Sequence, residues 1–334
     1  MTHSVSSDVR RMQVSIVIPV FNAETNLPEL YRQLMPAMES LVERFEVIMV
    51  EDGSRDRSWD VISALSARDP RVRGFRMSRN YGQHNALLCG IRAAKYGVIL
   101  TMDDDLQHPV SEISLLLQAL LQGHDVVYGS SNDNQHDLWR NVASRMTKLA
   151  LQRAMGASSA SQVSAFRAFP TRLRDAFHDY RSPSVSIDAL LTWATTRFTA
   201  VSVKHAPRLS GTSNYTVRKL ITHAFNLMTG FSTMPLKLAS VIGFGFTLFG
   251  FAVLAWVLGR YFIQGTSVPG FPFLASLIAI FSGAQMFTLG IFGEYLARMY
   301  GRSMERPTYV VLETSEQSAE PANVAHRAPS RREA

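Results

Sequence analysis

The amino-acid sequence predicts an α/β protein with a mixed, mostly parallel sheet and helices on both faces, followed by a hairpin of two apolar helices. Two observations lead to this fold class. Short β-branched runs alternate with helix-patterned segments from Val14 to Tyr128, a pattern typical of mostly parallel sheets. Two later runs without a charged residue, Leu238–Leu258 and Phe271–Phe292, are each long enough to cross the hydrocarbon core of a bilayer, about 30 Å, as a helix.

The α/β part begins at Val14–Val20, a β-branched run that predicts a buried strand. A helix is expected over Leu27–Arg44 and a second strand over Glu46–Glu51, followed directly by Asp52-Gly53-Ser54. The alternation then predicts helix, strand, helix, strand, helix and strand over Ser58–Ala67, Val72–Met77, Gln83–Lys95, Val98–Met102, Val110–Gln122 and Asp125–Tyr128.

The later part of the chain is organised around the two apolar runs. Scattered apolar positions before them predict an amphipathic helix on the membrane surface, although an amphipathic helix packed on the core has the same pattern. The polar C-terminus is expected to be disordered. The predicted division is therefore a flexible N-terminus, an α/β domain, an interfacial helix, two transmembrane helices (about 236–258 and 271–293), a cytoplasmic segment and a tail, over residues 1–12, 13–216, 217–233, 234–293, 294–312 and 313–334.

The basic residues around the hairpin predict its orientation. Lys and Arg flank both ends, whereas the linker between the apolar runs contains only Arg260; the flanking residues are Arg218, Lys219, Lys237, Arg298, Arg302 and Arg306. Because cytoplasmic loops carry the excess of Lys and Arg, both ends and the α/β domain are expected on the cytoplasmic side. The predicted location is the inner membrane, with two crossings.

Composition excludes several classes of function. The formal net charge is +7, but no basic low-complexity run or zinc-finger spacing indicates nucleic-acid binding. Cys89 is the only cysteine, so no internal disulfide can form and a reducing compartment is compatible. The absence of a G-x-G-x-x-G motif after any predicted strand argues against a dinucleotide-dependent oxidoreductase.

Acidic clusters follow two of the predicted strands. Glu51-Asp52 comes after the second strand, and Asp103-Asp104-Asp105 comes after the fourth. Ligands of such sheets bind beyond the carboxyl ends of the strands, where these clusters are expected to lie close together. Clustered carboxylates suit Mg²⁺ or Mn²⁺ that also bind substrate phosphates, although a solvated turn before a helix would favour Asp as well.

These motifs resemble those of the family 2 glycosyltransferases with a GT-A fold. Among them it is similar to the polyprenyl-phosphate sugar transferases, such as undecaprenyl-phosphate aminoarabinose transferase and dolichol-phosphate mannose synthase. The resemblance covers about residues 13–312. It rests on Ile18–Asn22, Glu51–Ser54, Arg79–His84, Asp103–Pro109, Arg208 with Gly211, Ser213 and Tyr215, and the segment from Gly293-Glu294-Tyr295 to Arg306-Pro307.

The resemblance implies a role for each matching residue. Asp103, Asp105 and Gln107 are expected to hold the metal ion, Mg²⁺ or Mn²⁺, and the diphosphate, and together with Arg208 they form the expected catalytic set. The residues expected to bind the donor, with Asp52 contacting the nucleotide base, are Pro19, Phe21, Asn22, Glu24, Asp52, Asn80, Gln83 and Asp104. Those expected to bind the acceptor phosphate are Arg140, Arg145, Arg208 and Ser213. Arginine suits this task because its planar fork binds phosphate bidentately.

The sequence departs from the family pattern in two places. Residues 161–167 contain no acidic residue where relatives often have Asp, and Asn214 stands where relatives often have Lys. A base is not required if the nucleophile is a phosphate monoester, whose second pKa is about 6, because it is already largely dianionic near neutral pH.

The expected function is metal-dependent, inverting transfer of a sugar from a nucleotide-sugar to a polyprenyl phosphate such as undecaprenyl phosphate, for cell-envelope glycan or lipid modification. The expected nucleotide is UDP. The expected partners are the donor, the lipid and the membrane, without nucleic acid. A homo-oligomer is compatible with the sequence. Two alternatives are a processive polysaccharide synthase, whose Gln-x-x-Arg-Trp motif is absent from the sequence, and a non-catalytic membrane scaffold, in which the acidic triplet need not be kept.

Overall fold

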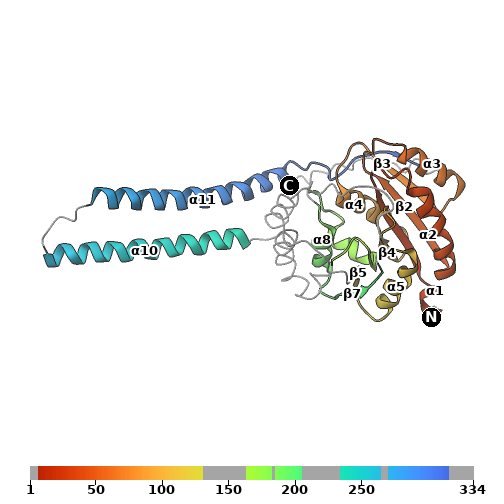
Figure 1. The fold of residues 1–334 in the computed structure, drawn as a ribbon, viewed down its shortest axis with the longest axis horizontal. Coiled ribbons are helices and arrows are strands. Elements are labelled where there is room, and N and C mark those ends of the chain that lie inside the picture. The colour runs from red at the N-terminus through yellow and green to blue at the C-terminus, as the bar shows by residue number, and fades with distance from the viewer. Residues whose placement is uncertain (1–6, 131–162, 183–184, 205–233, 265–269, 316–334) are drawn as a thin grey trace, which may run out of the picture.

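The computed structural model describes residues 7–130, 163–182, 185–204, 234–264 and 270–315. These residues form an α/β domain from which two long helices extend side by side (Figure 1). Predictions for residues 1–6, 131–162, 205–233 and 316–334 lie outside the described residues.

The α/β domain is built on one sheet, which has eight strands in the described part of the chain, in the order β7-β5-β6-β4-β1-β2-β3-β8. The four strands at its centre, β3-β2-β1-β4, are parallel, as are β5 and β7. Strands β6 and β8 run antiparallel to their neighbours, which confirms a mixed, mostly parallel sheet. The strands β1 to β8 are Gln13–Val20, Arg44–Glu51, Val72–Met77, Val98–Thr101, Val126–Ser130, Arg167–Pro170, Phe198–Ser202 and Val311–Thr314.

Helices cover both faces of this sheet. On one face α1, α2, α3 and α5 pack against the core, and on the other face α4, η2 and α8 do so. Strands β1 and β2 are each buried at seven of their eight positions, because helices cover both faces of the sheet, as expected for parallel strands. The bounds are α1 Ser7–Arg10, α2 Leu27–Leu41, α3 Ser58–Arg68, α4 Gln83–Ala93, η1 Val110–Glu112, α5 Ile113–Leu121, η2 Thr171–Phe177 and α8 Ile187–Ala194.

Several predicted boundaries near the N-terminus are wrong. The helix expected over Leu27–Arg44 ends at Leu41, because Val42 is extended and β2 already begins at Arg44. Residues 7–12 were expected to be flexible, but they include α1, and Val9 packs into the core with no exposed surface. The helix expected over Val110–Gln122 starts as the 3-10 turn η1 before α5.

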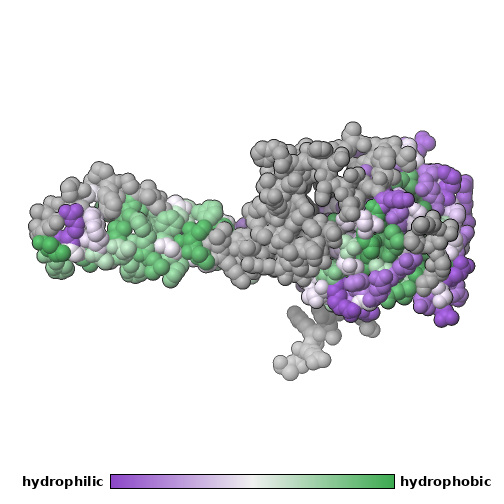
Figure 2. Space-filling view, turned by 60° about the horizontal axis from the view of Figure 1, so that its bottom comes forward, coloured by the Kyte–Doolittle hydropathy of each residue, from purple (hydrophilic) through white to green (hydrophobic). Residues whose placement is uncertain are grey.

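The two long helices are α10, Met234–Gln264, and α11, Phe271–Ser303. They contact each other where the Phe281 ring packs edge-on against Phe246 at a centroid distance of 5.8 Å and lies over Gly250. Both are longer than predicted, and α11 continues ten residues into the segment 294–312 that was predicted to follow the second apolar helix. Figure 2 shows mostly hydrophobic surface over this pair, whereas the visible face of the α/β domain is mixed, with hydrophilic surface around a hydrophobic area.

The chain returns to the α/β domain after α11. Val311–Thr314 forms β8, which pairs antiparallel with β3 at the edge of the sheet. Ser315 extends the contact, because its side chain accepts a hydrogen bond of 2.7 Å from the Gly74 amide and its own amide donates to the Gly74 carbonyl at 3.0 Å. Residues 313–315, assigned from the sequence to a disordered tail, are therefore part of the sheet.

Candidate active site

Three loops meet at the carboxyl edge of the central strands. They are residues 21–26 after β1, residues 52–57 after β2 and residues 102–109 after β4. The chain crosses from one side of β1 to the other between β3 and β4, so β1 and β4 border a topological switch point. Open α/β sheets bind ligands at such a point. The arrangement brings together the loops that carry the predicted donor-binding and metal-binding residues.

The loops after β1 and β2 are joined by hydrogen bonds to backbone groups. The Asn22 side-chain oxygen accepts a hydrogen bond from the Arg55 backbone amide at 2.8 Å. The Asn22 backbone amide donates to the Ser54 hydroxyl at 3.0 Å. The Glu24 carboxylate accepts from the Arg57 amide at 2.9 Å. Asn22 has a φ of +54°, a left-handed conformation that Asn tolerates better than most residues. Asn22 and Glu24 therefore fix the shape of this edge of the sheet, and their contact with a donor stays a prediction.

Asp52 is buried beneath the loop that connects β3 to α4. Its carboxylate accepts hydrogen bonds from the amides of Tyr81 at 2.7 Å and Gly82 at 2.8 Å. Burial raises the pKa of Asp52 to about 6, although the two amide hydrogen bonds act in the opposite direction. The structure thus gives Asp52 a role in holding residues 79–82, and its contact with a nucleotide base stays a prediction.

Gly53 allows the loop after β2 to approach that same connection closely. Its φ is +68°, and a Cβ atom added to it would lie 2.6 Å from the Arg79 carbonyl carbon and still closer to the Asn80 amide nitrogen. Neither backbone atom can move without moving the loop. The glycine of the Asp52-Gly53-Ser54 turn is thus required by its conformation and by the neighbouring backbone of Asn80, which is itself exposed.

The three carboxylates after β4 have three different partners. Asp103 accepts a hydrogen bond of 2.7 Å from the Gln83 side chain, and Asp105 accepts one of 3.1 Å from the Gln107 amide. Asp104 turns towards β1 and accepts from the Phe21 amide at 3.2 Å. Burial, reinforced by the neighbouring carboxylates, raises the pKa of Asp104 to about 7. The side chains of this motif are therefore spread around the turn.

Two of these carboxylates fit a divalent cation that is shared with a substrate. Among the described residues no group of three or more His, Cys, Asp or Glu side chains could by itself hold a metal ion. Mg²⁺ usually binds one or two carboxylates together with waters and substrate phosphates, so a complete protein cage is not expected. Asp103 and Asp105 supply such a pair, whereas Asp104 is committed to Phe21.

The remaining predicted residues have mixed outcomes. Pro19 is buried inside β1, and Phe21 lies at the site with 46% of its surface exposed. Gln83, at the start of α4, reaches Asp103. The four residues predicted for the acceptor phosphate, Arg140, Arg145, Arg208 and Ser213, lie outside the described residues.

Sequence reasoning missed a buried ion pair behind the acidic motif. Arg167 of β6 binds Asp188 of α8, and the exposed fractions of their side chains are 2% and 10%. Each is a single charge inside an apolar run, Ala165–Pro170 and Ile187–Leu191. A lone charge of this kind is rarely buried unless it is paired, so this pattern was an available signal.

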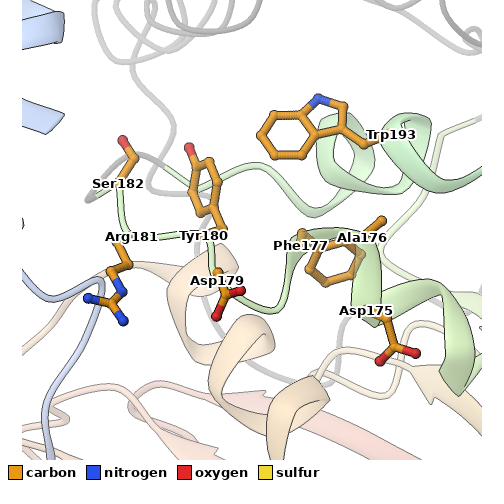
Figure 3. A pocket seen from close by; sticks show the side chains of 8 residues that line it. All are labelled: Asp175, Ala176, Phe177, Asp179, Tyr180, Arg181, Ser182 and Trp193. Atoms are coloured by element: carbon orange, nitrogen blue, oxygen red, sulfur yellow. The ribbon is translucent and has the colours of Figure 1, made fainter. Parts of the chain in front are cut away.

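A separate cavity of about 410 Å³ lies between η2 and α8 (Figure 3). The Trp193 ring stands across from Tyr180 at a centroid distance of 5.6 Å, with Phe177 beneath it. The cavity contains none of the predicted site residues, and the carboxylates of Asp175 and Asp179 point away from the rings. It is therefore distinct from the edge that carries the acidic motif.

Comparison with known proteins places these features in a family. Residues 15–181 match the model of the family described as glycosyl transferase family 2. Undecaprenyl-phosphate 4-deoxy-4-formamido-L-arabinose transferases from Pseudomonas paraeruginosa and Pseudomonas syringae pv. syringae are each 38% identical to the chain, over 89% of both proteins in each case. The enzyme of that name from Pseudomonas fluorescens is 36% identical over 93% of this chain and 92% of its own.

A solved structure supports the fold alone. Glucosyl-3-phosphoglycerate synthase from Mycobacterium tuberculosis, in complex with Mn²⁺, UDP-glucose and glycerol 3-phosphate, aligns with a TM-score of 0.50 and 17% identity. The alignment covers 65% of this chain and 78% of that one. The sheet and its covering helices are therefore of the GT-A type.

Proposed function

Because the chain belongs to glycosyl transferase family 2, we propose that it is a metal-dependent, inverting enzyme that transfers a sugar from a nucleotide-sugar to undecaprenyl phosphate. The observation that carries the acceptor is the similarity to transferases named for undecaprenyl phosphate, at 38% identity over 89% of both chains. The same names make 4-deoxy-4-formamido-L-arabinose the first donor sugar to test, with UDP as the first nucleotide.

In the proposed reaction a phosphate oxygen of the lipid attacks the anomeric carbon of the donor sugar. The new oxygen–carbon bond forms on one face while the bond to the diphosphate breaks on the other, so the centre is inverted and the nucleoside diphosphate leaves with the bonding electrons. A phosphate monoester is largely dianionic near neutral pH, so no protein side chain has to remove a proton from it.

The chain's own residues position the two substrates. The loops after β1, β2 and β4 would hold the donor, and Asp103, Asp105 and Gln107 would hold the cation. When bound, that cation neutralises the charge that develops on the leaving diphosphate. Arg208, with Arg140, Arg145 and Ser213, is proposed to bind the lipid phosphate.

The long helices supply the route to a lipid acceptor. Ala239–Arg260 of α10 is long and apolar enough to cross a membrane, by its length and composition. Large apolar side chains face outward on both helices, such as Phe244, Phe251 and Leu289, each more than 60% exposed. Exposed apolar surface of this extent favours burial in lipid. We propose that both helices cross the inner membrane and that the α/β domain faces the cytoplasm, as the flanking basic residues predict.

The test is transfer by the full chain in detergent or vesicles. Labelled nucleotide-sugars are incubated with undecaprenyl phosphate, and the lipid is extracted and analysed. We expect one sugar on each lipid phosphate, and none on the dephosphorylated alcohol. A product that keeps lengthening would favour the processive synthase, and the absence of labelled lipid with every donor would favour the scaffold.

A further inference from the structure

The inference starts from the ion pair between Arg167 and Asp188. Both residues are buried, and the Arg167 guanidinium donates to Asp188 Oδ1. The Tyr128 hydroxyl donates to the same oxygen at 3.0 Å, so Asp188 is held from β5 as well as from β6. A buried ion pair is often no more stabilising than apolar residues of similar volume. Stability alone therefore does not explain this pair.

Arg167 holds the end of the strand that leads into the acidic motif. Its Nε donates to the Thr101 hydroxyl at 3.2 Å, and Thr101 is directly opposite Arg167 in the antiparallel pairing of β4 with β6. The Thr101 hydroxyl in turn donates to the Ala165 carbonyl at 2.6 Å. Thr101 is the last residue of β4 and stands two positions before Asp103. Arg167 thus fixes the strand side of the motif.

Asp188 belongs to the first turn of α8, and α8 fixes the other side of the motif. The Ile187 amide donates to His84 Nδ1 at 3.3 Å, at the start of α4. The neighbouring Gln83 donates to Asp103 at 2.7 Å. Contacts therefore run in a closed ring from Asp103 through α4, α8 and β6 back to β4, and the Arg167–Asp188 pair is the link between the two halves.

We propose that the Arg167–Asp188 pair is a positioning pair for Asp103. It sets Asp103 in the geometry needed to share a cation with the donor diphosphate, without touching either substrate. The proposal rests on the proposed function for the role of Asp103. The directional hydrogen bonds of an arginine can fix two elements at once, which an apolar pair cannot do.

The key variant is the double substitution Arg167→Met with Asp188→Leu in the full chain. It removes both charges, so no unpaired charge is left buried. We expect a melting midpoint near that of the wild type. Binding of Mn²⁺ in the presence of UDP, measured from the spectrum of free Mn²⁺, should weaken by about 10-fold or more, as for residues that orient metal ligands. Turnover should fall by about 10²-fold, the effect of a misplacement of about 1 Å, with the lipid KM unchanged.

A matched control lies at the opposite ends of the strands. Arg73 and the buried Glu46 form an ion pair of 2.7 Å, with side-chain exposures of 11% and 5%. Arg73→Met with Glu46→Leu should change Mn²⁺ binding by less than 2-fold. The proposal is overturned if the Arg167–Asp188 double variant melts normally and binds Mn²⁺ and turns over within 2-fold of the wild type.

If that double variant does not fold, Thr101→Val decides. It removes only the Thr101 hydroxyl contacts and keeps the shape of the side chain. Weaker Mn²⁺ binding by 3-fold or more supports the proposal, and unchanged binding overturns it. These binding measurements are independent of the acceptor, so wild-type protein that binds Mn²⁺ with UDP but modifies no lipid phosphate would count against the proposed function alone.

Discussion

Replacement of Gly53 by alanine tests the geometry of this carboxyl edge of the sheet most directly. Gly53 has a φ of +68°, a conformation that costs an L-residue about 1–2 kcal/mol. The new Cβ would also lie 2.6 Å from the Arg79 carbonyl carbon, whereas real Cβ contacts are essentially never below 3.0 Å. The Arg79 carbonyl carbon must therefore move by about 0.4 Å and the closer Asn80 amide nitrogen by more, and forced overpacking of this kind costs about 1–3 kcal/mol.

The two costs together predict that Gly53→Ala loses about 2–5 kcal/mol of stability. The displacement should also reach the site, because the same loop donates two amides to Asp52 and leads into Gln83, which binds Asp103. We expect the donor KM to rise more than the lipid KM. The measurements are the melting midpoint of the full chain in detergent and steady-state kinetics with each substrate varied separately.

Two other glycines separate the contributions. Gly82 has a φ of +97° but no atom within 4 Å of an added Cβ, so Gly82→Ala should show the conformational cost without the clash. Gly97 has open space and no positive φ, so Gly97→Ala should stay within about 0.5 kcal/mol of the wild type. The reasoning is refuted if Gly53→Ala melts no lower than Gly82→Ala.

Three further predictions concern the metal, pH and topology. Asp105→Asn should keep the fold and lower turnover by about 10²–10³-fold, and full activity in EDTA would contradict the metal role. The pKa of Asp52 is raised from 3.8 to about 6 in the folded state. The contribution of Asp52 to the free energy of unfolding is therefore fully present below pH 3.8 and is lost as the pH rises through 6. Melting midpoints from pH 4 to 7 should show that loss, at most about 3 kcal/mol, in the wild type relative to Asp52→Asn. If the midpoints of the two proteins change in parallel with pH, Asp52 is not the group responsible. A reporter fused after Arg306 should be cytoplasmic and one placed between residues 265 and 270 external, and two reporters on one side would rule out two crossings.

The central strands were predictable because short buried runs alternate with helix-patterned segments, and β1 and β2 are each buried at seven of eight positions. β3 has its predicted bounds, and β1 and β2 differ from theirs only at the N-terminal ends. Strands β6 and β8 were missed because neighbours, not their own composition, decide their pairing. β6 has four residues and begins with Arg167, whose charge is compensated only by Asp188 from a distant helix. β8 is mostly exposed and has no alternation that a pattern could detect.

The acidic motif could be located from the sequence, but its internal geometry could not. The strand ends predicted that Asp52 and Asp103 lie at one edge, and the fold confirms it. That Asp104 turns to the Phe21 amide while Asp103 binds Gln83 depends on backbone angles after β4, including a φ of +61° at Leu106. Such conformations are set by tertiary contacts and leave no periodic signal.

The pairing of β8 with β3 also requires that the chain between these two strands cross a membrane an even number of times. Gly74 and Ser315 are hydrogen-bonded although 241 residues separate them, and both long helices lie within that interval. During synthesis the sheet stays open at β3 until the chain beyond α11 emerges, and an unpaired edge invites misassembly. Closure by the nascent chain is possible only if that chain is on the same side of the bilayer as the sheet. If α10 crosses the membrane, the polypeptide must cross back before Val311. An odd number of crossings would place β8 on the opposite side of the membrane from β3, where the two strands could not pair.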